Sequence, residues 1–159
     1  MKTLGVAALA AVLLGTMGTA LAAQPDYLDD RSTAASLVRS FYNAIDRQEY
    51  ARAYTYFSDN APEPYAQFAA GYADTASVTV ATGAAVSDGA AGSVFYTLPV
   101  AIDAVSSRGT HRQFAGCYTT RLTQPADQDP PVVPMYIYKA TLKPAHGNIH
   151  SLLPNCAPQ

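Results

Sequence analysis

The spacing of apolar residues changes once along this chain, from a helical period to a strand period. Up to Tyr72, apolar side chains recur every three or four residues, as in Leu37, Phe41 and Ile45, which places them on one face of a helix. From Ser77 onward, apolar and polar residues alternate, which is typical of strands with one buried face. Helices followed by strands predict an α+β fold, in which three N-terminal helices pack on an antiparallel sheet of about four strands.

Polar and proline residues mark the ends of the three expected helices. The first helix follows Ser32, which can cap its N-terminus, and it carries the apolar stripe described above. A polar break at 46–48 separates it from a short second helix, which ends at 58–60. Pro64 suits the first turn of a third helix, whose aromatic residues again have helical spacing.

Turn signals at 87–89, 106–109 and 125–134 separate the expected strands. In the longest strand the even-numbered residues of 94–102 form the apolar face, and the even positions of the two following strands are again the more apolar. We therefore expect the even-numbered face to be buried. Pro99 cannot donate a ladder hydrogen bond, so it predicts either a local sheet edge or a bulge that bends the sheet.

The first residues of the chain predict export. Lys2 precedes an apolar run at 4–14, and small residues lead to Ala22, which is the pattern of a secretory signal peptide cleaved near Ala22. A transmembrane anchor is the alternative, but the run is shorter than the roughly 20 residues that span a bilayer. We expect a secreted or periplasmic protein with no membrane span in its mature form. The predicted segments are a signal peptide (1–22), an N-terminal extension (23–31), a folded domain (32–143) and a C-terminal tail (144–159).

The two cysteines, Cys117 and Cys156, have no competing partners in an oxidising compartment. We therefore predict one disulfide, which would tie the C-terminal tail back over the outer face of the third expected strand. Two free thiols are the alternative. Closing a loop of about 40 residues would stabilise the fold by roughly 3 to 4 kcal/mol in the chain-entropy model.

Charge and motif content argue against several function classes. A formal net charge of −2 on an exported chain disfavours nucleic acid as a partner. His146 and His150 have a metal-binding spacing only on a helix, and Gly147 between them disfavours a helix, so no metal site is expected. Phosphate loops, dinucleotide fingerprints and a G-x-S-x-G serine are absent from the sequence, and no cofactor is expected.

The helical half carries FYNAI at 41–45 and EYARAY at 49–54, and FAAGYADT at 68–75 is followed by SVTV at 77–80. In these motifs, residues 32–143 resemble the nuclear transport factor two-like superfamily, and more narrowly its secreted bacterial members of unassigned function. The resemblance implies a cystatin-like fold, in which three helices and a strongly curved sheet form a cone. It also implies a pocket on the concave face of the sheet.

The resemblance implies candidate site residues as well. The pocket would be lined by six tyrosines from the helices and from even-numbered strand positions: Tyr42, Tyr54, Tyr72, Tyr96, Tyr118 and Tyr138. Such a wall suits a small, flat, partly polar ligand, and plain core packing of these tyrosines is the alternative. Enzymes of the superfamily place an acidic or histidine base inside the cone. Asp74 is the remaining candidate for such a base, and a capping or turn role is its alternative.

Three functions from different classes follow. The first is an exported, non-catalytic module that binds a small molecule or a partner protein through the aromatic pocket or the sheet face. The second is an isomerase- or dehydratase-type enzyme with a carboxylate in the pocket. The third is a structural or assembly protein of the cell envelope, in which the sheet forms a homodimer or pairs with another envelope protein.

Overall fold

The computed structural model describes residues 24–157, so the predicted signal peptide and its cleavage site lie outside the described residues. Within that range three α-helices and a five-stranded antiparallel sheet form, which confirms the predicted α+β class. The helices are α1 (Ala34–Asp46), α2 (Tyr50–Tyr54) and α3 (Tyr65–Tyr72), with short 3-10 helices η1 (Thr55–Phe57), η2 (Pro125–Asp127) and η3 (Ile149–Leu152). The strands are β1 (Thr75–Thr82), β2 (Val86–Ala90), β3 (Ser93–Ser106), β4 (His111–Thr123) and β5 (Tyr136–Ala145). None of the helices in this part of the chain is long and apolar enough to cross a membrane.

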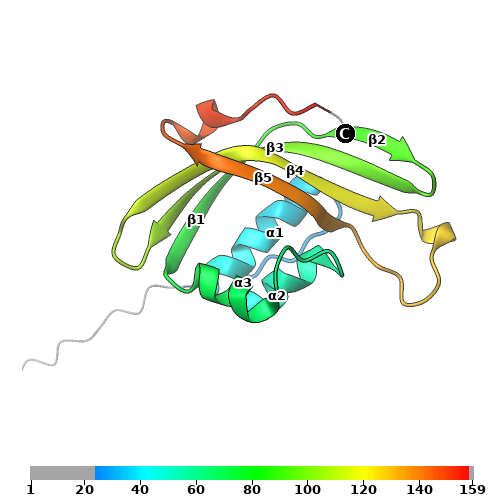
Figure 1. Ribbon diagram of the computed structural model, residues 1–159, viewed down its shortest axis with the longest axis horizontal. Coiled ribbons are helices and arrows are strands. Elements are labelled where there is room, and N and C mark those ends of the chain that lie inside the picture. The colour runs from blue at the N-terminus through cyan, green and yellow to red at the C-terminus, as the bar shows by residue number, and fades with distance from the viewer. Residues whose placement is uncertain (1–23, 158–159) are drawn as a thin grey trace, which may run out of the picture.

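Helix α1 forms because its N-terminus is capped and one of its faces is apolar. The Thr33 hydroxyl accepts a hydrogen bond from the Ser36 N–H at 3.0 Å. Leu37, Phe41 and Ile45, the predicted stripe, are fully buried. Figure 1 shows α1 lying across the concave side of a curved sheet, with α2 and α3 on the same side. The core of the protein therefore lies between the helices and this inner face.

Strand β3 organises the sheet because it is paired along both edges. β4 follows one edge, while β2 and β1 share the other. Pro99 lies where the neighbour changes, since pairing with β2 ends at Thr97 and pairing with β1 begins at Val100. The carbonyl of Pro99 accepts a hydrogen bond from the Gly83 N–H at 2.9 Å. The proline thus occupies a local gap in the ladder, which agrees with the predicted edge position.

The sheet has five strands rather than about four, because the segment predicted as a turn at 87–89 is part of a strand. β2 pairs with the start of β3 and places Asp88 opposite Phe95. The chain reverses instead at Gly92, whose φ of +72° lies in the left-handed region that favours glycine. Gly89 and Gly92 lie three residues apart, and the chain turns at Gly92.

Burial of even-numbered residues is confirmed in the middle of β3 and fails at the start of β5. Leu98 and Val100 are fully buried against the helices. In β5 a bulge shifts the register by one residue, so Ile137 pairs with Thr120 and is fully buried, while Tyr138 is 41% exposed. One extra residue in a strand exchanges the faces of the residues beyond it. The predicted alternation is therefore wrong at this end of β5.

The segment before α1 is held tightly against the helices. Asn43 donates a hydrogen bond to the Asp26 carbonyl at 2.8 Å and accepts one from the Leu28 N–H at 3.0 Å. Arg52 donates to the Leu28 carbonyl at 2.8 Å, and its guanidinium lies over the Tyr27 ring at 4.5 Å from the centroid. This N-terminal segment is therefore part of the fold.

Cys117 and Cys156 form the predicted disulfide, with Cα atoms 6.0 Å apart. The tail runs back over the face of the sheet opposite the helices, as Figure 1 shows, and its Gly147 N–H donates to Gln113 Oε1 at 2.9 Å. The tail also contains the short helix η3. It therefore covers part of the outer face of the sheet.

Candidate functional site

A cavity of about 520 Å³ lies between α3, the segment at 60–63 and the inner face of β4 and β5. It exists because the helices cover β5 only in part: Ala140 points to the same inner face as its partner Tyr118, yet it is exposed. The aromatic residues of the lining are Tyr42, Phe57, Phe68, Tyr72, Phe114, Tyr118 and Tyr138. The charged residues of the lining are Glu63, Arg112 and Lys139.

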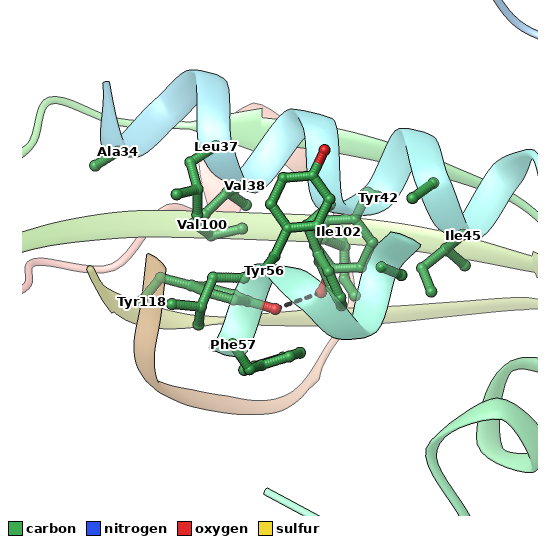
Figure 2. Close-up of a cluster of buried hydrophobic side chains, with 14 of the residues drawn as sticks. Ala34, Leu37, Val38, Tyr42, Ile45, Tyr56, Phe57, Val100, Ile102 and Tyr118 are labelled. Carbon is green, nitrogen blue, oxygen red and sulfur yellow. Dashed lines mark hydrogen bonds between the residues drawn. The ribbon is translucent and has the colours of Figure 1, made fainter. Parts of the chain in front are cut away.

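Tyr42 of α1 and Tyr118 of β4 meet at the buried base of this cavity. Their hydroxyl oxygens lie 2.6 Å apart, and Figure 2 shows the two rings reaching toward each other from the helix and the sheet. Burial raises the pKa of the Tyr42 phenol well above its ordinary value of 10, and burial also raises the pKa of Tyr118. Both phenols stay protonated in neutral solution, so the pair can donate a hydrogen bond but cannot act as a base.

The helical wall of the cavity consists of aromatic rings that pack on one another, Phe68 and Phe57 edge to face and Phe68 and Tyr72 in a tilted arrangement. The Phe68 ring lies 5.1 Å from the Tyr72 ring and 6.0 Å from the Phe57 ring. Burial, with a smaller contribution from the Glu63 charge, raises the pKa of Tyr72 to about 12. These three rings therefore form an apolar surface, with one phenol that remains a hydrogen-bond donor.

The six tyrosines predicted for the pocket separate into two groups. Tyr42, Tyr72, Tyr118 and Tyr138 line the cavity, whereas Tyr54 and Tyr96 do not. The Tyr54 hydroxyl donates to the Glu63 carbonyl at 2.8 Å, so it links α2 to the 60–63 segment. The Tyr138 ring packs on Phe95, with centroids 5.4 Å apart, so it lies at the margin of the cavity.

Asp74, the candidate catalytic base, lies at the surface and outside the cavity. Its carboxylate accepts a hydrogen bond from the Ser107 hydroxyl, and the Arg108 guanidinium lies 3.8 Å away. The Asp74 carbonyl also accepts from the Ser107 N–H at 2.9 Å. These contacts fasten the end of α3 to the turn between β3 and β4, which is the turn role given above as the alternative.

A partly buried carboxylate occurs instead at Asp46, which the sequence pattern placed simply at a helix end. Its Oδ1 accepts a hydrogen bond from the Val78 N–H at 2.6 Å. Desolvation raises the Asp46 pKa to about 6, although the hydrogen bond from Val78 lowers it by a smaller amount. The sequence signal for the burial of Asp46 is its position directly after Ile45, which belongs to the buried stripe of α1. Because Asp46 does not line the cavity, it joins α1 to β1 rather than serving the site.

Several lining residues were not singled out from the sequence. Arg112 and Phe114 occupy even positions of β4, on the same face as Tyr118, so the alternation that placed Tyr118 also applied to them. Phe57 continues the apolar spacing of the second helix into η1, whereas Glu63 lies in the loop before α3, where periodicity gives no direction. The three histidines are exposed, and residues 24–157 contain no cluster of side chains that could hold a metal ion.

Comparisons with family models, curated proteins and solved structures found no match to this chain.

Proposed function

We propose that this protein is an exported, non-catalytic module that binds a small molecule in the aromatic cavity. The cavity itself carries this proposal. Its volume of about 520 Å³ falls within the range of about 300 to 1,000 Å³ found for small-molecule sites. Its wall combines apolar rings with a few polar groups, and such a wall favours a flat, partly polar ligand.

The likeness to the nuclear transport factor two-like superfamily is part of the same proposal. Three helices precede an antiparallel sheet and lie on its concave side, and the cavity opens between the two layers. This arrangement supports a cone-like fold with a pocket at one end. Export is supported by the bond between Cys117 and Cys156, because disulfides persist mainly in oxidising compartments.

Turnover has less support than binding. Among the described residues, the carboxylate that lines the cavity is Glu63, in the loop before α3, and the phenols at the base are held in their protonated form. An assembly role through the outer face of the sheet is supported less as well, because the disulfide-tied tail occupies part of that face.

The test is saturable binding of a neutral fluorophore, N-phenyl-1-naphthylamine, to the mature protein. Ala140→Phe adds a ring inside the cavity, and Thr141→Phe adds the same ring to the opposite face of the same strand. We expect Ala140→Phe to weaken binding at least about tenfold, because it occupies the site, and Thr141→Phe to leave it unchanged. Absence of saturable binding to the wild type, or equal effects of the two variants, would contradict the proposal.

A further inference from the structure

Arg112 places a positive charge at one end of the cavity. It lies on β4 opposite Ala104 of β3, and both residues line the cavity. Phe114 and Tyr118 occupy the same face of β4, so the strand presents, in order, a cation, an apolar ring and a phenol. The inner face of one strand therefore has a charged end and a buried polar end, with aromatic surface between them.

The guanidinium of Arg112 makes no hydrogen bond or ion pair with any described residue. The other arginines in this part of the chain each make a hydrogen bond or an ion pair: Arg31, Arg39, Arg47, Arg52, Arg108 and Arg121. A guanidinium has five N–H donors in a planar fork that matches a carboxylate. Arg112 is thus available for an anion, at a place where an apolar wall lies beside it.

The phenol pair adds a second donor at the other end. In the bond between Tyr42 and Tyr118 one hydroxyl hydrogen is used, and the hydroxyl that accepts keeps its own hydrogen. No described residue accepts that second hydrogen. Because both phenols are buried and line the cavity, an acceptor atom of a ligand can take this position.

Glu63 limits the charge that a ligand can carry. Its carboxylate lies on the helical side of the cavity, close enough to Tyr72 to help raise the pKa of that phenol. A second negative charge on a ligand would be repelled there, whereas one negative charge at the Arg112 end is attracted.

We propose that the ligand is an amphipathic organic monoanion whose carboxylate pairs with Arg112 and whose aromatic body lies on Phe68, Tyr72 and Phe114. This inference rests on the proposed binding function and adds the chemical class of the ligand. The pairing is bidentate, with two guanidinium N–H groups donating to the two carboxylate oxygens. An acceptor at the far end of the ligand takes the spare phenol hydrogen.

The experiment compares two probes of the same shape, 2-naphthoate and its neutral amide 2-naphthamide. Their dissociation constants are measured by calorimetry with the wild-type protein, with Arg112→Gln and with Lys143→Gln. Lys143 is exposed on β5 and does not line the cavity, so its replacement is the control for the same loss of charge. Circular dichroism confirms that each variant is folded.

We expect the wild type to bind naphthoate at least about tenfold more tightly than naphthamide, because a hydrogen bond between charged groups contributes more binding free energy than one to a neutral amide. Arg112→Gln removes this preference by weakening naphthoate binding alone, and Lys143→Gln keeps the preference. Equal binding of both probes to the wild type, or a preference that survives in Arg112→Gln, overturns the monoanion inference and leaves the binding function standing. Failure of both probes and of N-phenyl-1-naphthylamine overturns the binding function itself.

Discussion

The hydroxyl oxygens of Tyr42 and Tyr118 lie 2.6 Å apart and join residues separated by 76 positions in the sequence. The bond connects α1 to β4, so it links the helical layer to the sheet at the base of the cavity. Each hydroxyl is buried and has the other as its hydrogen-bond partner. The pair therefore contributes to stability and also provides the polar end of the candidate site.

Removal of one member of this pair should destabilise the fold. Tyr118→Phe leaves the buried Tyr42 hydroxyl without a partner, which costs about 1 to 3 kcal/mol, and Tyr42→Phe has a similar effect. The double variant should cost less than the sum of the single variants, because it leaves no unpaired hydroxyl. Urea denaturation of the four proteins measures this coupling. Additive costs would show that the hydroxyls are satisfied independently of each other.

Asp46 should make stability depend on pH between about 4 and 7. Its folded-state pKa is raised from 3.8 to about 6, so folding favours the protonated form. The resulting stabilisation is fully present below the unfolded pKa and is lost as the pH rises through about 6. Asp46→Asn keeps an oxygen for the Val78 N–H and does not ionise, so it should lose this dependence and gain stability relative to the wild type at neutral pH.

Urea midpoints at acidic and neutral pH test the Asp46 prediction. Asp88→Asn, which alters an exposed carboxylate on β2, is the control and should follow the wild type. If the wild type and Asp46→Asn respond in parallel across this range, the Asp46 carboxylate is ionised equally in the folded and unfolded chains and the prediction is wrong.

Gly116 should not tolerate a side chain. A Cβ at this position would lie 1.8 Å from the Thr141 carbonyl oxygen, so β4 and β5 would have to separate locally. Gly116→Ala should therefore cost at least about 2 kcal/mol, as overpacking against backbone does. Gly89→Ala in β2 meets no atom within 4 Å and is the matched control, with little expected change. Thermal unfolding compares the two, and equal midpoints would contradict the prediction.

Asn43 should control the docking of the N-terminal segment. Its side chain binds both the Asp26 carbonyl and the Leu28 N–H, so Asn43→Ala removes two contacts of this segment together. Amide hydrogen exchange of residues 26–30 should accelerate by about tenfold or more, while exchange in β3 stays unchanged. Unchanged protection of residues 26–30 would show that Arg52 and Tyr27 hold the segment without Asn43.

Much of the fold was predictable because periodicity reports burial directly. The stripe through Leu37, Phe41 and Ile45 predicted α1, and the alternation around Leu98 and Val100 predicted the buried face of β3. These signals are repeated over several residues, so no single irregularity hides them. The disulfide was predictable for a different reason, since two cysteines allow one pairing.

Other features depend on single residues whose effect is not periodic. The bulge in β5 buries Ile137 and exposes Tyr138. The alternation of apolar and polar residues does not indicate this bulge, because the extra residue appears only in the pairing of β5 with β4. Asp46 looked like any helix-end carboxylate, and its desolvation follows from contact with β1. The alternation places Arg112 on the same face of β4 as Tyr118, but the cavity that makes this position a candidate site depends on how the helices cover the sheet.

The most direct test of the binding account is an NMR titration of the isotope-labelled mature protein with N-phenyl-1-naphthylamine. The account predicts saturable shift changes that centre on Phe68, Tyr72 and Tyr118 and extend to Ala140, which all line the cavity. Shift changes confined to the outer face of the sheet and the tail, or no saturable change at all, would contradict the claim that this cavity binds a small molecule.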